Sequence, residues 1–300
     1  MINNILKTMV CISLVAITSD SIASKADSTR LPGDHFSLEA ALGQLKDSET
    51  PQDFERRINN SSNGVNNLDL NLDGKVDYMR VSADGKGDER ILIITAVISE
   101  NEQQDVAVVE IQKQGPDNAL LQIVGDDALY GQSRIVEPFE ETRNSDENDQ
   151  GDMGPSADLE TASDIWINVW YWPCVRHCFG PSFVLYVSPW YWGYYPDWWS
   201  PWPPLAWGHF HAVFITHHPH YHPVMVHRTS RLHQSIYAPR RVSSPRVQQN
   251  FKEPIRRFRE THPSAPRPNN PSNRLQKPRP EQQNPSQPRP NNSPHKQRRP

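Results

Sequence analysis

The apolar, β-branched residues of this chain gather into four short runs between residues 76 and 124. Each run has the length of one strand, and only a few turn-forming residues separate it from the next. Connections this short favour antiparallel pairing of consecutive strands, because parallel neighbours need a long crossover. The pattern therefore predicts a four-strand antiparallel meander. Its strands are expected at Val76–Val81, Ile91–Ile98, Val106–Ile111 and Leu120–Val124.

Two helices are predicted before the first strand. Ser37 can cap a helix whose apolar residues recur at helical spacing from Leu38 to Leu45. Thr50 and Pro51 provide the cap and first position of a second helix. Because the helices precede the strands and do not alternate with them, we expect an α+β domain over residues 35–138, with both helices packed on one face of the sheet.

The rest of the chain lacks the composition for a second large core. Proline accounts for 28 of the 300 residues, and 36% are hydrophobic, against roughly 45–50% in an ordinary globular chain. We therefore interpret residues 139–164 as an acidic linker and residues 165–228 as an irregular segment rich in Trp and His. Residues 229–300, in which Pro-Arg-Pro pieces recur, are predicted to be a disordered tail.

Residues 1–26 have the pattern of a secretory signal peptide. Lys7 precedes the apolar stretch Met9–Ile17, and small residues follow it. The stretch is too short to remain as a membrane span. We expect cleavage after Ala23 or Ala26 and a periplasmic or secreted protein.

The two cysteines beyond this segment, Cys174 and Cys178, would then meet an oxidising compartment. Pro173 and Gly180 frame one helical turn between them, which places both sulfurs on one face. A local disulfide is the prediction. Ligation of copper or zinc together with His177 is the alternative.

Charge is unevenly distributed along the chain. Residues 25–164 hold 12 basic and 30 acidic side chains, a net charge of −18, whereas residues 228–300 hold 17 basic and 3 acidic ones, a net charge of +14. Arginines spaced along a flexible tail bind polyanions through charge alone. The expected partners are an envelope polyanion, a membrane surface or another envelope protein, with no specific nucleic acid. The chain's own acidic domain is a further polyanion within reach, and a solubilising tether is the plainer alternative.

A short acidic loop is a candidate calcium site. Its oxygen ligands fall at alternating positions, and Gly74 permits the sharp turn that would bring them together. Arg80 stands where an EF-hand has a bidentate Glu, so the expected affinity is weak, about 10⁻⁴–10⁻³ M. The alternative is an Asx-rich turn that holds no ion. The candidate ligands are Asp69, Asn71, Asp73, Lys75 (through its carbonyl) and Asp77.

Eight of the twelve histidines lie between residues 209 and 233. Imidazole nitrogens suit zinc or copper, and histidines two apart in an extended chain share one face. No His-Glu-x-x-His motif accompanies them, and decoration of a polar surface segment is the alternative. The candidate transition-metal ligands are His209, His211, His217, His218, His220 and His222.

All nine tryptophans lie between residues 166 and 207, among many prolines. Aromatic surfaces of this kind face membrane interfaces, sugars or protein partners. A small loop-rich core that the aromatic side chains fill for themselves is the other interpretation.

The pieces Asn67–Tyr78, Gln104–Ile111, Ile123–Asp126 and Tyr130–Gly131 resemble a domain of uncharacterised exported envelope proteins of Gram-negative bacteria, in which a Trp-rich C-terminal half follows. The resemblance implies a secreted or periplasmic location and no particular activity. The loop at residues 69–77 alone is also similar to calcium loops of the dockerin and integrin-repeat type.

The sequence contains no Gly-x-Ser-x-Gly, zincin or Gly-rich phosphate-loop motif. We therefore expect a non-enzymatic envelope protein with a binding or scaffolding role, acting through the Trp/His-rich segment and the basic tail. A periplasmic metal-handling protein that uses the histidine cluster is the alternative.

Export can be tested with a reporter fused after Ala26. Because the apolar stretch directs secretion, the fusion should leave the cytoplasm and lose its N-terminal segment. N-terminal sequencing of the recovered protein checks this, and a mature protein that retains Met1 contradicts it.

Overall fold

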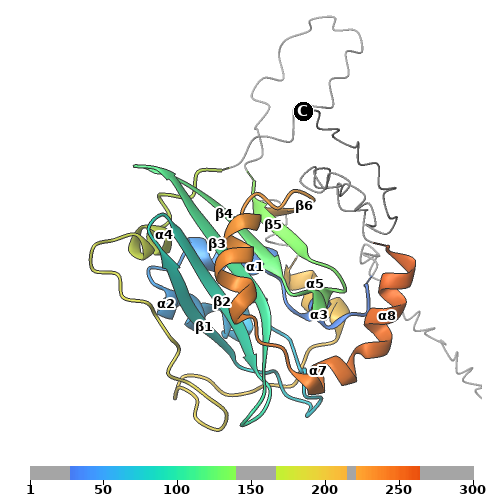
Figure 1. The fold of residues 1–300 in the computed structure, drawn as a ribbon. Coiled ribbons are helices and arrows are strands. Elements are labelled where there is room, and N and C mark those ends of the chain that lie inside the picture. The colour runs from blue at the N-terminus through green and yellow to red at the C-terminus, as the bar shows by residue number, and fades with distance from the viewer. Residues whose placement is uncertain (1–27, 140–166, 215–220, 264–300) are drawn as a thin grey trace, which may run out of the picture. The chain divides into compact units, whose positions relative to one another are not determined.

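The computed structural model describes residues 28–139, 167–214 and 221–263. It confirms the predicted α+β class: in this part of the chain, six antiparallel strands pair in sequence order, with helices on both faces (Figure 1). The strands are β1 (Met79–Lys86), β2 (Glu89–Val97), β3 (Gln103–Gly115), β4 (Asn118–Gly125), β5 (Arg134–Pro138) and β6 (Tyr221–Val224).

The α-helices are α1 (Leu38–Lys46), α2 (Pro51–Ile58), α3 (Asp127–Tyr130), α4 (Pro173–Cys178), α5 (Trp207–Phe214), α6 (Ser230–Leu232), α7 (Pro245–Asn250) and α8 (Lys252–Thr261). The other helical turns are η1 (Pro32–His35), η2 (Ser61–Asn63), η4 (His233–Tyr237), which is a π-turn, and η5 (Ala238–Arg240).

The first two helices begin where the sequence predicts. The Ser37 hydroxyl accepts the backbone N–H of Ala40 at 2.9 Å, and the Thr50 hydroxyl accepts that of Asp53 at 3.1 Å. Each cap satisfies one backbone donor that the helix itself leaves unpaired.

Helices α1 and α2 cover one face of the sheet, which we call the first face. Successive strand residues point to opposite faces, so Leu92 and Ile94 of β2 turn toward these helices, as do Val109 and Ile111 of β3. The apolar stripe of α1 that meets them is fully buried. This layer is the predicted core.

The predicted four-strand meander is correct for β1–β4 but omits two strands. β5 pairs with β4, and β6, from the Trp/His-rich segment, extends the sheet by pairing Ile135 with Val224 and Pro138 with Tyr221. β6 is four residues long and contains Pro223, which is tolerated because the strand lies at the edge of the sheet. So short a strand has no readable period, which explains why the sequence pattern misses it.

The predicted start of the disordered tail at residue 229 is wrong. Residues 227–263, which we call the C-terminal segment, form α6, η4, η5, α7 and α8. Leu232 and Ile236 stand four residues apart and share one helical face, and each is less than a tenth exposed. Residues 1–27, 140–166, 215–220 and 264–300 lie outside the described residues, so the signal peptide, most of the linker and the rest of the tail stay predictions.

The first part of the C-terminal segment, residues 230–240, covers the second face of the sheet; in Figure 1 it is the orange helix in front of β2 and β3. Leu232, Ile236 and Tyr237 pack there in one cluster with strand residues. These strand residues alternate along the chain with those that point to the first face. The strand residues of this cluster are Ile91, Ile93, Val108, Val124 and Ile135. The sheet is therefore buried on both faces.

Ion pairs hold the same segment to the acidic domain. Arg241 pairs with Asp126 through two bonds of 2.5 and 2.7 Å, and Arg240 pairs with Asp84 at 2.6 Å. Asp126 is 5% exposed, so its charge depends on this guanidinium for compensation. Within the described residues, the basic C-terminal half thus binds the chain's own acidic domain.

The aromatic segment does not build a separate core. Trp199 packs on Tyr78 and Val97 of the α+β domain, joined by Trp190, Tyr195 and Trp202. Other aromatic side chains of the segment stay exposed, as the interpretation of an exposed aromatic surface expects. These are Tyr171, Tyr191, Trp192, Tyr194 and Trp198.

We predict that Leu232→Ala destabilises the protein by about 2–4 kcal/mol, because a 1% exposed side chain leaves a cavity between the C-terminal segment and the second face. Urea unfolding measures the change. Val226→Ala, at a side chain 54% exposed, is the control and should stay within about 0.5 kcal/mol of the wild type. Equal stability of both variants would show that the segment is not part of the cooperative fold.

Asp105 on β3 is 1% exposed. Its side chain accepts hydrogen bonds from the Thr95 hydroxyl at 2.9 Å and from the backbone N–H of Val242 at 2.8 Å. Burial raises the pKa of Asp105 from 3.8 to about 6. Because the folded chain holds the proton of Asp105 more tightly than the unfolded chain, this group does not lower the free energy of unfolding at low pH. The free energy of unfolding then falls as the pH rises from about 4 through 6.

Asp105→Asn removes that charge, so the variant should gain about 1–3 kcal/mol over the wild type between pH 4 and pH 8. Chemical unfolding at both pH values gives the difference. Asp88→Asn, in the exposed β1–β2 turn, should show no such gain. A pH-independent difference for Asp105→Asn would mean that the folded protein carries this carboxyl ionised at both pH values.

Candidate metal centre

Glu110 is the one acidic residue within the apolar run 106–111 of strand β3. Its neighbours Val109 and Ile111 point to the first face, so Glu110 points the other way, with its side chain fully buried. A carboxylate removed from water is costly unless it is paired and hydrogen-bonded. The partners of Glu110 therefore decide what this position can do.

Three side chains from the C-terminal segment meet this carboxylate. His227 Nε2 donates to one oxygen at 2.8 Å, and His233 Nδ1 donates to the other at 2.5 Å. The Thr229 hydroxyl donates to the oxygen that His227 binds. The imidazole rings lie edge to face, with centroids 5.0 Å apart. The His227 and His233 side chains are 22% and 25% exposed, so the cluster is reachable from solvent on the histidine side.

Gln122 on β4 fixes the backbone that presents these ligands. Its carbonyl oxygen accepts the backbone N–H of Arg228 at 2.8 Å, and its amide donates to Glu137 at 3.0 Å and to the Val226 carbonyl at 2.9 Å. Arg228 in turn reaches Glu137 at 3.4 Å. The polar residues on the second face of β3, β4 and β5 thus form one network around the two histidines.

The electrostatics keep Glu110 ionised. Burial alone would raise the pKa of its carboxyl, but the hydrogen bonds from His227, His233 and Thr229 together outweigh it, and the pKa lies below the usual range. An ionised carboxylate between two imidazoles is a negatively charged oxygen donor beside two nitrogen donors.

The three groups have the spacing of a metal site. One ligand atom from each of Glu110, His227 and His233 lies within 4.8 Å of the others, and among the described residues this is the only such group of His, Cys, Asp or Glu. A tetrahedral zinc ion needs its nitrogen and oxygen ligands roughly 3.3 Å apart, since its bonds are about 2.0–2.2 Å long. The present N···O separations of 2.5 and 2.8 Å must therefore open slightly when one ion replaces these hydrogen bonds.

Sequence reasoning selected other histidines. His209 and His211 lie on α5, where His211 stacks on Trp207, and His222 lies on β6 against Phe139. His217, His218 and His220 lie outside the described residues. The histidines that meet Glu110 are His227 and His233, which that set did not include. The overlooked signal was Glu110 itself, an isolated acid within a buried apolar run.

The predicted calcium loop forms the Asx turn of the alternative interpretation. Gly74 adopts a φ of +82°, as expected, and Asp69 accepts the backbone N–H groups of Asp73 and Gly74 at 3.0 and 2.9 Å. Asn71 accepts the same Asp73 N–H, and Asp77 accepts that of Leu70. Burial, with the charges of Asp69 and Asp73, raises the pKa of Asp77 to about 8. The three loop carboxylates do not form a group in which all ligand atoms lie within 4.8 Å of one another, so a calcium site here, with the Lys75 carbonyl as a further ligand, stays a prediction.

Cys174 and Cys178 lie on α4, which spans the predicted helical turn. Both are buried free thiols joined by a hydrogen bond, which together with burial raises the pKa of Cys174 far above its usual range. The disulfide between them stays a prediction.

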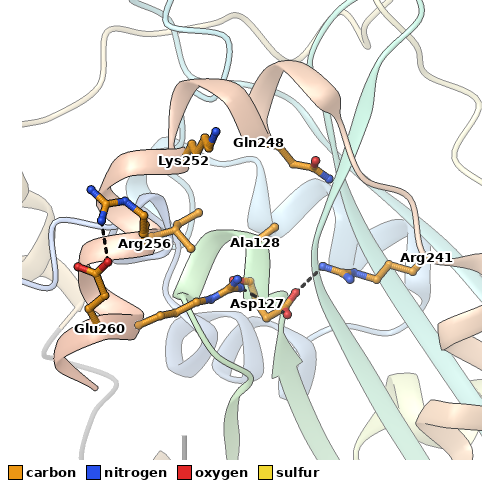
Figure 2. A pocket seen from close by; sticks show the side chains of 9 residues that line it. Asp127, Ala128, Arg241, Gln248, Lys252, Arg256 and Glu260 are labelled. Carbon is orange, nitrogen blue, oxygen red and sulfur yellow. Dashed lines mark hydrogen bonds and ion pairs between the residues drawn. The ribbon is translucent and has the colours of Figure 1, made fainter. Parts of the chain in front are cut away.

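A cavity of about 630 Å³ lies between α3 and helices α7 and α8 (Figure 2). Its charged groups are largely paired: Arg241 with Asp127 at 2.5 Å, and Arg256 with Glu260 at 2.6 Å. Exposed pairs of this kind contribute about 0–1 kcal/mol each. We therefore interpret the cavity as a space left between the C-terminal segment and α3, where the pair of Arg241 and Asp127 attaches the segment.

Comparisons with protein-family models, characterised proteins and solved structures give no match to this chain. Among the described residues, no helix has the length and apolar character needed to cross a membrane. The resemblance to exported envelope proteins and the location that it implies stay predictions.

Proposed function

We propose that this protein is a non-enzymatic metal-binding protein of the cell envelope, in which Glu110, His227 and His233 hold one Zn²⁺ ion. The observation that carries the proposal is the convergence of one buried carboxylate and two imidazoles within 4.8 Å, from elements more than a hundred residues apart in sequence. The predicted signal peptide supports the location.

The donor set favours a borderline transition metal. Two imidazole nitrogens and one carboxylate oxygen suit zinc, and they also suit copper, which binds such sites more tightly in the general order of divalent affinities. Calcium and magnesium require six or more oxygen ligands, and this cluster offers a single carboxylate.

The groups behind the ligands support the same conclusion. Metal-binding side chains are normally oriented by hydrogen bonds from a second layer of residues. Thr229 provides that bond for Glu110, and Gln122 holds the backbone of Arg228 and Thr229 in place. Two of the ligands are already partly exposed, so an ion can enter without unfolding the domain.

Binding at this position would be linked to folding. One ligand belongs to the central sheet and the other two to the C-terminal segment, so the ion would join both parts. An ion that binds only the folded chain stabilises it by about 1.4 kcal/mol for each tenfold excess over its dissociation constant.

The test uses the full chain without a histidine tag, freed of metal with EDTA. Isothermal titration with Zn²⁺ and with Cu²⁺ should give one site per chain, and zinc should raise the melting temperature. His227→Ala and His233→Ala should each weaken binding by at least about a hundredfold, because only two protein ligands remain. Glu110→Gln should also weaken metal binding, because it replaces the charged oxygen ligand with a neutral amide.

His262→Ala, on the exposed end of the same C-terminal segment, is the matched control and should bind metal as the wild type does. Folded wild-type protein that binds no zinc or copper would contradict the proposal and leave the cluster as a hydrogen-bonded attachment of the segment. Binding that survives His227→Ala but is lost on replacing His209, His211 and His222 would return the site to the histidines that the sequence pattern favoured.

A further inference from the structure

The aromatic segment and the acidic loop enclose a pocket of about 230 Å³, far from the metal cluster in sequence and built from other elements. Its polar wall is formed by Asp73, Lys75 and Asp77 of the loop. Its aromatic wall is formed by Trp192, Tyr195 and Trp199. Neither the metal cluster nor the core packing accounts for this combination.

The aromatic wall is built on a fixed support. Tyr78 is 1% exposed, and its hydroxyl donates to Glu55 of α2 at 2.8 Å. Trp199 meets the Tyr78 ring edge to face at 5.0 Å, and Tyr195 lies 4.7 Å from Trp199. These rings are held in place before any ligand arrives, which reduces the entropy lost on binding.

A backbone bond joins the two walls. The N–H of Val76, in the acidic loop, donates to the carbonyl of Trp202, in the aromatic segment, at 2.9 Å. Asp77 is itself fixed, because it accepts the backbone N–H of Leu70 at 2.6 Å. The distance between carboxylates and rings is therefore set by the fold.

The two walls of the pocket offer the aromatic surface and the hydrogen-bonding groups that together bind a sugar ring. Trp192 is 39% exposed and presents apolar aromatic surface. Asp73 and Lys75 are exposed and provide an acceptor and a donor for hydroxyl groups. Trp199 lines the pocket, and its indole N–H is buried and has no acceptor among the described residues. A pyranose combines an apolar C–H face with a ring of hydroxyls, and it matches this mixture.

We propose that this pocket binds one pyranose unit of a neutral saccharide. Other ligand classes fit less well. The carboxylate of Asp73 repels phosphate and other anions, and the Lys75 ammonium repels the quaternary ammonium groups that aromatic sites otherwise favour. The pocket is also smaller than the roughly 300–1,000 Å³ typical of sites for larger ligands. The proposal is independent of the metal function.

The test measures binding of glucose, galactose, N-acetylglucosamine and their β-linked tetramers to the full chain, by saturation-transfer NMR and calorimetry. We expect saturable binding of at least one of them, with transfer strongest at the protons of one sugar face. Trp192→Ala should weaken it by at least about tenfold, because it removes the exposed stacking surface. Asp73→Asn should weaken it less.

Tyr171→Ala is the control, because Tyr171 is also an exposed aromatic, at 67%, and does not line the pocket. It should bind as the wild type does. Circular dichroism melting should show that Trp192→Ala remains folded. Absence of binding by the whole panel at about 10 mM, or binding that Trp192→Ala leaves unchanged, overturns the proposal. Choline binding that depends on Trp192, without sugar binding, assigns the pocket to cations and overturns it as well.

Discussion

The rest of the structure depends on one interaction. Buried carboxylates on the second face of the sheet pair with side chains and backbone N–H groups of the C-terminal segment. Glu110, Asp105 and Asp126 are each 5% exposed or less. The C-terminal segment supplies each of them with hydrogen-bond donors, from side chains and from backbone N–H groups. Without that segment, these acidic residues would face water on the second face of the sheet.

This arrangement explains why so basic a stretch folds. Its few apolar side chains would not by themselves offset the entropy of ordering it. Leu232 and Ile236 anchor the segment, and its cations compensate charges that the acidic domain has already buried. The candidate metal centre lies within the same contact, because both of its histidines come from the segment. Ion binding and attachment of the segment are therefore one equilibrium in the function proposed here.

The aromatic segment is joined to the domain through a buried carboxylate of α2. Glu55 of α2 accepts hydrogen bonds from Tyr78, from Ser188 at 2.9 Å and from the backbone of Val81 at 2.7 Å. One buried carboxylate thus ties α2, β1 and the aromatic segment together. The rings that pack around Tyr78 gain a rigid base, while the outermost aromatic side chains stay exposed. A rigid base with an exposed rim is what a small binding pocket requires.

The sequence by itself determined the local structure: the capped helices at Ser37 and Thr50, the meander β1–β4 and the turn at Gly74. Each of these depends on residues close together in the chain, and their patterns are readable at that range. It also indicated an acidic half and a basic half that can bind each other. Only the tertiary structure decided that β6 joins the sheet, that residues 227–263 fold onto the domain as short helices and that Glu110 meets His227 and His233. These outcomes depend on contacts across more than eighty residues, where the gain comes from burying and pairing groups whose local sequence carries no period.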